Sequence, residues 1–311
     1  MKTVGVHLGA HKTATTHLQM GLAAVASAAR AEGLLIQTAP ATRRPPTDWH
    51  ALSLKGDAAD WGRAAAAMAD RCAGVDRLLL SEELILGDLT RGRFFGAGGV
   101  IYPRAAQRLA QVLAAIGGPP ATLFLSIRRP DSFLTSAFAE NLRTGRALLL
   151  ADYLDGFAVP ALRWSELIAR LAALPGVGEI VVWRYENLAA LRPAILARML
   201  GSGLAAQVTD SGPQREGVSR RAYRAILAAL PTTPAEERRA MIADAMARFP
   251  KGPRQPGLDP LHSRIKAASA AAYDRDCALI ARMDRVTLLE PGADPGSPVA
   301  AGLKQRRDGV I

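Results

Sequence analysis

The chain opens on the stretch that decides its fold, Met1-Lys-Thr-Val-Gly-Val-His-Leu-Gly-Ala-His-Lys-Thr-Ala-Thr-Thr-His-Leu-Gln19. Residues 4–8 form a short apolar run, which predicts a buried parallel strand. The run breaks at Gly9, a lysine and several hydroxyl residues follow, and an alanine- and leucine-rich stretch then predicts a helix. A strand, a tight turn with Lys-Thr and a helix are the parts of a phosphate-binding loop, in which backbone N–H groups at the helix start face the anion.

The residue types in this loop suit an anionic ligand. Lys12 supplies a point charge to the loop. Hydroxyl donors stand beside it at Thr13, Thr15 and Thr16. The loop of nucleotide triphosphatases requires a glycine directly before the lysine and a second glycine five residues earlier. His11 and Val6 occupy those two positions, so the segment departs from the triphosphatase form.

The loop instead resembles the 5′-phosphosulfate loop of sulfotransferases, whose pattern is Lys-Thr/Ser-Gly-Thr-Thr after the first strand. The pattern here is Lys12-Thr-Ala-Thr-Thr16, followed by a histidine and a leucine. Ala14 replaces the glycine of the family, so the backbone there must tolerate a Cβ atom. His17 stands where many members carry the tryptophan that stacks on adenine, and the resemblance implies that it lies near the base.

A second resemblance follows the apolar stretch 121–127, which predicts another buried strand. Sulfotransferases carry Arg-x-Pro after this strand and a serine eight residues after the arginine. Arg128, Pro130 and Ser136 meet that spacing. The resemblance implies that the planar guanidinium of Arg128 binds the ribose 3′-phosphate and that Ser136, on the next helix, reaches the same phosphate.

Two later segments complete the resemblance. The stretch Ile180-Val-Val-Trp-Arg-Tyr-Glu-Asn-Leu188 is similar to the family's strand that ends in Tyr-Glu-Asp-Leu, and it implies that Tyr185 packs at the nucleotide. Arg215-Glu-Gly-Val-Ser219 resembles the looser Arg-x-Asn-x-Ser pattern of bacterial members, which closes over the 3′-phosphate. Gly217 replaces the asparagine, and Ser219 suits a helix N-cap equally well.

Together these segments resemble the bacterial 3′-phosphoadenosine 5′-phosphosulfate (PAPS)-dependent sulfotransferases. The resemblance implies an α/β, P-loop-like fold of three layers, with a central, mostly parallel sheet flanked by helices and a helical C-terminal part. It also implies PAPS as donor, PAP as product, no metal, and a hydroxyl or amine acceptor on a carbohydrate, lipid or small metabolite. The acceptor stays open, because acceptor pockets are built from variable loops.

Two other functions stay open on the same fold. If the chain were a P-loop kinase or triphosphatase, an aspartate that binds Mg²⁺ would be expected directly after a strand. The stretch 77–81 is followed by two glutamates and the stretch 121–127 by two arginines, which disfavours that function. A catalytically inactive nucleotide-binding or interaction module is the second alternative, and the change at Ala14 keeps it open.

Sulfuryl transfer requires a base that takes the proton of the attacking group. Glu83 matches the Ser-x-Glu of bacterial relatives after the third strand and is the first candidate. Strand alternation sends its neighbour Glu82 the other way, and both carboxylates equally suit the cap of a following helix. His11 beside Lys12 and His50 in a loop over the site are the remaining candidates.

The hydrophobic pattern alternates strands with helices along the first two hundred residues. It predicts strands at 3–9, 34–37, 77–81, 121–127 and 179–184. It predicts helices at 15–32, 58–73, 103–116, 131–143, 160–173 and 187–200, and later at 219–230, 234–248 and 260–283. Such alternation indicates parallel crossovers, so the candidate motifs meet at the carboxyl edge of one sheet. We expect a single domain over 1–290, with a core at 1–200, a helical part at 215–285 and a loose tail at 291–311.

The composition fits this interpretation. The chain has 311 residues, of which 49% are hydrophobic and 22% charged, as in ordinary globular proteins. Aromatic residues make up only 5%, which disfavours nucleic-acid binding despite the net charge of +11. The surplus of basic residues suits an anionic donor or an acidic acceptor, or simply follows an arginine-rich composition. Two cysteines without metal-ligand spacing, and no visible signal or membrane segment, predict a cytoplasmic protein. The sequence leaves the oligomeric state open.

Overall fold

A six-stranded, all-parallel sheet forms the centre of the computed structural model. The structure describes residues 1–146, 148–209, 217–253 and 255–292. The strands lie in the order β2-β3-β1-β4-β5-β6. Their bounds are β1 (Thr3–His7), β2 (Leu34–Gln37), β3 (Arg77–Ser81), β4 (Ala121–Ile127), β5 (Val177–Arg184) and β6 (Val286–Leu289). The α/β class and the parallel sheet are thus confirmed.

Helices cover both faces of this sheet, because its strands are apolar on both sides. One face packs against α1 (Thr15–Ala24), α2 (Ala26–Ala31), α11 (Leu188–Leu200) and α12 (Ser202–Ala205). The other face packs against α5 (Ala58–Cys72), α7 (Ala105–Ile116), α8 (Pro130–Arg143), α10 (Trp164–Ala172) and α15 (Ser263–Ile280). Shorter helices connect these elements: α3 (Ala39–Thr42), α4 (Trp49–Lys55), α6 (Arg91–Phe94) and α9 (Leu150–Leu154).

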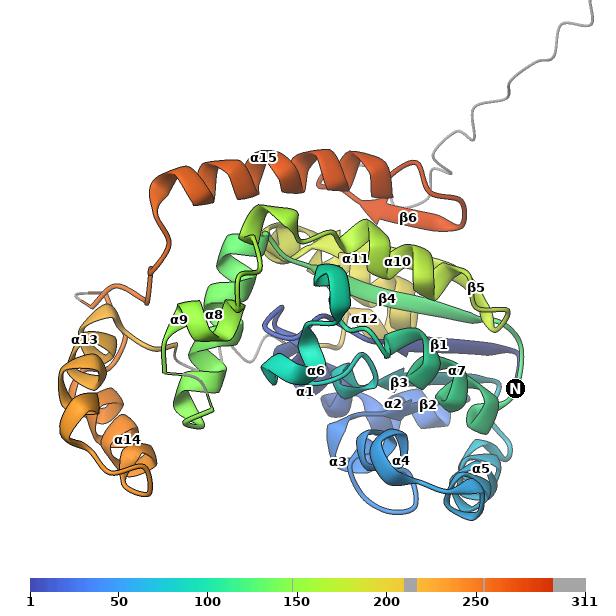
Figure 1. Cartoon of the computed structure of the whole chain (residues 1–311). Coiled ribbons are helices and arrows are strands. Elements are labelled where there is room, and N and C mark those ends of the chain that lie inside the picture. The colour runs from blue at the N-terminus through green and yellow to red at the C-terminus, as the bar shows by residue number, and fades with distance from the viewer. Residues whose placement is uncertain (147, 210–216, 254, 293–311) are drawn as a thin grey trace, which may run out of the picture.

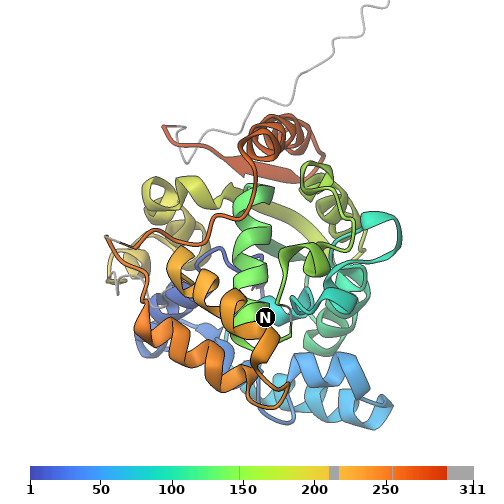
Figure 2. The same cartoon turned by 60° about the vertical axis from the view of Figure 1, so that its left-hand side comes forward.

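The carboxyl edge of the sheet lies opposite the N-terminus in Figure 1, toward α8. Two further helices, α13 (Arg220–Ala229) and α14 (Arg238–Arg248), lie beyond that edge and pack on α8, where Tyr223 meets Phe138 edge to face. Figure 2 shows this pair in front of α8, with α15 returning over the top of the sheet. The expected helical C-terminal part is therefore present, and it stands next to the edge where the motifs gather.

The expected elements differ from the observed ones at a few places. The helix predicted at 15–32 is broken at Val25, whose φ of −101° separates α1 from α2. The helix predicted at 160–173 begins only at Trp164, because residues 159–161 form a separate 3₁₀ turn. Strand β6 and the short helices α3, α4, α6, α9 and α12 were not predicted. A helix of four to seven residues makes at most two turns, which carry too little periodicity to be recognised in the sequence. Within the described residues no helix is long and apolar enough to cross a membrane.

Candidate functional site

The loop after β1 is anchored to the neighbouring strand. The backbone N–H groups of Leu8 and Gly9 donate to the Phe124 carbonyl at 3.0 and 3.4 Å, and Ala10 N–H donates to the Ser126 carbonyl at 3.2 Å. Gly9 has a φ of +43°, and a Cβ there would lie 2.2 Å from Thr15 Cγ2. Only glycine therefore lets the chain leave the strand and fold back over the start of α1.

The rest of the loop exposes the first turn of α1. Lys12 and Ala14 both have a φ of 64°, a left-handed conformation that is rare for residues with a Cβ. Thr13 is fully buried, and its hydroxyl donates to the Ala10 carbonyl. Ala14 occupies the N-cap position but offers no side-chain acceptor to the helix. The backbone N–H groups at this helix start therefore lack a capping side chain, which is the geometry of an anion site.

Arg128 joins this loop from the end of β4. Its Nη1 donates to the Lys12 carbonyl at 2.7 Å, and its Nε donates to Ser132 Oγ at 2.9 Å. Its guanidinium lies 4.5 Å from the centre of the Tyr185 ring. Burial lowers the pKa of Arg128, and Tyr185 and Glu186 act in the opposite direction. The structure thus places Arg128 against the loop and Tyr185 against Arg128, and their contacts with a nucleotide stay predictions.

The hydroxyl that contacts Arg128 belongs to Ser132 and not to Ser136. Ser136 lies one turn further along α8 and is half-buried, and no hydrogen bond of its side chain is found among the described residues. Glu140 lies another turn on, where its Oε2 is 3.2 Å from Lys12 Nζ. A spacing of four residues relates Arg128, just before α8, to Ser132, Ser136 and Glu140 within it. Residues at this spacing share one side of a helix, so this side of α8 faces the loop. Neither Ser132 nor Glu140 was among the predicted site residues, although this spacing was available in the sequence.

Glu82 is fully buried at the end of β3 and is held by four donors. Arg43 Nε and Nη2 bind its two oxygens at 2.8 and 2.7 Å, and the Thr42 hydroxyl donates at 2.6 Å. Leu84 N–H donates to it at 3.0 Å, which caps a 3₁₀ turn at Glu83–Ile85. This carboxylate therefore serves the local structure, as the capping alternative for it predicts.

Glu83 points another way and keeps some solvent contact. Its side chain is 13% exposed, Arg43 Nη2 donates to its Oε1 at 2.9 Å, and Gln19 Nε2 donates to its Oε2 at 2.9 Å. Burial acts to raise the pKa of Glu83, but His11 and Arg43 together outweigh burial and lower it. Glu83 is thus an ionised carboxylate at neutral pH, in reach of the charges around the loop. Arg43 and Gln19 were not predicted to take part.

The His11 ring is held in place by Tyr102, which lies just before α7. Its Nδ1 lies 2.9 Å from the Tyr102 hydroxyl, and the two rings stack with centroids 5.8 Å apart. Its Nε2 is buried and has no hydrogen-bond partner among the described residues. Burial lowers the pKa of His11 to about 4, and Glu83 acts against this shift. A neutral imidazole with one unpaired nitrogen therefore lies next to Lys12.

The remaining predicted residues are placed as follows. His50 lies on α4 with its Nε2 3.9 Å from Asp88 Oδ2, and its pKa is lowered by burial and by Arg108. His17 is half-buried on the first turn of α1. Ser219 is buried, caps α13 through Ala222 N–H, and donates to the Phe249 carbonyl at 2.6 Å. Both hydrogen-bonding functions of Ser219 are thus used within the fold. Arg215 lies outside the described residues.

A row of polar side chains lies beneath the loop on one face of the sheet. Ser81, His7, Ser126 and Trp183 come from the neighbouring strands β3, β1, β4 and β5. His7 Nδ1 lies 2.7 Å from Ser81 Oγ, and its ring stacks on Trp183 at 6.0 Å. His7 Nε2, Ser126 Oγ and Trp183 Nε1 are buried without a hydrogen-bond partner in the described part of the chain. Among the described residues, only one of the two His7 nitrogens therefore has a hydrogen-bond partner.

His7 is expected to make the protein sensitive to mild acid. Burial lowers its pKa from 6.5 to about 4, so the unfolded chain takes up a proton before the folded chain does. Stability is therefore full above pH 6.5 and falls toward pH 4, by about 2 kcal/mol between pH 7 and pH 5 from His7 alone. Denaturant unfolding at the two pH values measures this loss. The His7→Asn variant should lose about 2 kcal/mol less over the same interval, and an unchanged loss would contradict the assignment.

Comparisons with known proteins add no identity to this geometry. No family model matches the chain, and no curated protein matches it either. A cavity of about 720 Å³ among the described residues lies away from the loop. It is lined by Phe95, Phe157, several glycines and the Arg91–Asp155 ion pair, and by none of the predicted site residues. The functional argument therefore depends on the side chains around Lys12.

Proposed function

We propose that the protein is a sulfotransferase that moves a sulfuryl group from PAPS to a hydroxyl or amine of an acceptor. The observation that carries this proposal is the meeting of two segments at the carboxyl edge of the sheet. One is the loop with Lys12 at the start of α1, and the other is Arg128, which binds the Lys12 carbonyl and stacks on Tyr185. Two cationic side chains beside an uncapped helix start suit a ligand with phosphates at two positions.

The residues present fit this donor by their chemistry. Lys12 and the N–H groups of the first turn of α1 are donors for the 5′ side, and Thr15 and Thr16 stand in that turn. The Arg128 fork and the Ser132 and Ser136 hydroxyls are donors for a 3′-phosphate. The half-buried ring of Tyr185 suits the nucleoside between them. When bound, PAPS supplies the sulfuryl group and a phosphate leaving group. Lys12 then neutralises the charge that grows on the leaving oxygen.

Binding measurements test the donor directly. PAP is expected to bind at least about tenfold more tightly than AMP, because only PAP engages Arg128 through a charge-assisted contact. Isothermal titration calorimetry of the full chain with PAP, AMP and ATP measures the difference. The Arg128→Gln variant should bind PAP and AMP with similar affinity. Equal affinity of the wild-type protein for PAP and AMP would remove the 3′-phosphate assignment.

Glu83 is the carboxylate that the geometry favours as the base. Glu83→Gln keeps the shape and the Gln19 contact but removes the basicity, so turnover should fall at least about tenfold while PAP affinity stays near that of the wild type. The pH profile of kcat should rise at or below the ordinary range of a glutamate, because Arg43 and His11 lower the pKa of Glu83. Burial alone would raise the pKa of Glu83 and so move the rise of the pH profile to a higher pH.

Two control variants separate Glu83 from the histidines. His50→Ala and His11→Asn should each retain more activity than Glu83→Gln if the carboxylate accepts the proton. An active Glu83→Gln enzyme together with an inactive His50→Ala enzyme would transfer the role to His50. Tight PAP binding without turnover on any acceptor would favour the inactive binding module. Hydrolysis of ATP with Mg²⁺ would favour the triphosphatase.

A further inference from the structure

A second cavity, of about 360 Å³, lies between the end of α8, the segment before α6, and helix α14. Three arginines line it, Arg91, Arg146 and Arg238, from three separate parts of the chain. Asp152 is the acidic residue among the lining side chains, and Arg91 is paired with Asp155 next to it. The cavity therefore holds more cationic than anionic groups.

The cationic groups in this cavity are incompletely paired. Arg238 Nε is buried and has no hydrogen-bond partner among the residues that the structure describes. Arg146 makes one long contact, with Nη1 3.4 Å from Thr90 Oγ1. A buried N–H group without an acceptor is costly, whereas an oxyanion accepts from several guanidinium groups at once. The donor set thus fits an anionic group.

The wall of the cavity is rigidly built. Gly145, at a φ of +70°, ends α8 in a Schellman turn, in which Gly145 N–H donates to Leu142 and Arg146 N–H donates to Asn141, each at 2.9 Å. This turn fixes where Arg146 leaves the helix. Asn141 Nδ2 and the Tyr153 hydroxyl both donate to the Leu89 carbonyl, at 2.9 and 3.1 Å. The cavity therefore has a defined shape.

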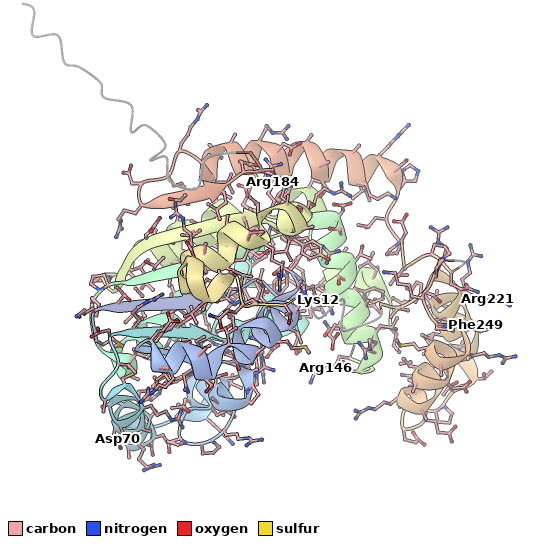
Figure 3. The ribbon with its side chains drawn as sticks, turned by 180° about the vertical axis from the view of Figure 1, so that it is seen from behind. Lys12, Asp70, Arg146, Arg184, Arg221 and Phe249 are labelled. Atoms are coloured by element: carbon pink, nitrogen blue, oxygen red, sulfur yellow. The ribbon has the colours of Figure 1, made fainter. Side chains whose placement is uncertain are left out.

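The same two elements connect the cavity to the candidate active site. On α8, Glu140 contacts Lys12, and the next residue, Asn141, lines the cavity. On the segment before α6, Asp88 lies near His50, and Thr90 lines the cavity. Figure 3 shows Lys12 beside α8 and Arg146 at the end of that helix. Three helical steps lead from Glu140 to Arg143, the last residue of α8, roughly 5 Å along the axis, and the Schellman turn then carries the chain to Arg146.

We propose that this cavity binds an anionic group of the acceptor, a sulfate, phosphate or carboxylate, while the acceptor's nucleophile lies near Lys12 and Glu83. The acceptor is then an acidic molecule that reaches from this cavity to the reacting atom. This inference rests on the proposed sulfotransferase function for the word acceptor. The anion site itself rests only on the cavity and its arginines.

Selenate tests the anion site without any turnover. Crystals of the full chain soaked in sodium selenate should show anomalous scattering from selenium between Arg146 and Arg238. The Arg146→Gln/Arg238→Gln variant should lose this peak, and Arg146→Gln alone, at an exposed position, should weaken it if the double variant does not fold. Arg239→Gln, an exposed neighbour with the same charge change, should keep it. Selenate at the Lys12 loop alone would overturn the proposal.

Kinetics with paired acceptors tests the source of the anion. For an acceptor with an anionic group, Arg146→Gln/Arg238→Gln should raise KM at least about tenfold and leave kcat within about twofold, whereas its neutral analogue should be unaffected. Equal KM changes for both acceptors, or none, would mean that the cavity holds a free or adventitious ion only and would overturn the acceptor assignment. If selenate binds in the cavity but no acceptor is sulfated, the sulfotransferase function fails and the anion site remains.

Discussion

Lys12→Ala is expected to lower kcat for sulfuryl transfer by about 100-fold or more, because in the proposed reaction Lys12 acts on charge that develops only in the transition state. The loop that carries it is anchored elsewhere, by the Phe124 and Ser126 carbonyls and by the buried Thr13. Loss of the ammonium group should therefore leave the loop in place. Steady-state kinetics with PAPS and an acceptor, together with PAP affinity, measure the effect.

Glu140→Gln is the matched control for this variant. It removes the partner that lies 3.2 Å from Lys12 Nζ and keeps the lysine, so kcat should stay much closer to that of the wild type. Arg128→Ala should act mainly on donor affinity, by about 2–4 kcal/mol. Two results together would overturn both roles. The Lys12→Ala enzyme would have a normal kcat and a raised KM for the donor, and the Arg128→Ala enzyme would have a lowered kcat and a normal KM for the donor.

Arg43→Ala is expected to reduce the free energy of unfolding by about 3–5 kcal/mol. The variant leaves Glu82, which is 0% exposed, as a buried carboxylate without a counter-ion. The hydroxyl of Thr42 and the Leu84 N–H remain, but neither carries a charge. Denaturant unfolding at neutral pH measures the loss.

A double-mutant cycle shows whether Glu82 is the cause. Glu82→Gln should recover a large part of the stability in the Arg43→Ala background, because the unpaired charge is then gone. Glu83→Gln in the same background should recover much less, since the Glu83 side chain is 13% exposed and reaches water. Strict additivity between Arg43→Ala and Glu82→Gln would contradict the role of this ion pair.

The hydrophobic pattern of the sequence predicted three strands and the edge of the sheet at which the candidate motifs meet. The strands at 34–37, 77–81 and 121–127 have the expected bounds, because each is a short apolar run between polar segments. The meeting of the Lys12 loop with Arg128 also follows from parallel strand order, which brings carboxyl ends to one edge.

The side chains that contact the candidate site residues from distant parts of the chain could not be predicted from such patterns. Tyr102 reaches His11 over 91 residues of chain, Arg43 reaches Glu82 over 39, and Lys12 reaches Glu140 over 128. No periodicity or motif spacing encodes such pairs, since they depend on how loops of different length return to the sheet edge. Ser132 is a different case, because it stands four residues after Arg128 at a helix start and the family spacing directed attention to Ser136 instead.

The guanidinium of Arg43 contacts two adjacent carboxylates that serve different purposes. One of them, Glu82, belongs to the interior, and the other, Glu83, faces the charges around the loop. Arg43 directly follows the short helix α3, whose only buried residue is Thr42. Local opening of that segment would withdraw the same cation from both carboxylates at once. The proton affinity of Glu83 is thereby coupled to the order of a peripheral stretch of chain, so a molecule that binds and holds α3 would also set how strongly Glu83 holds its proton.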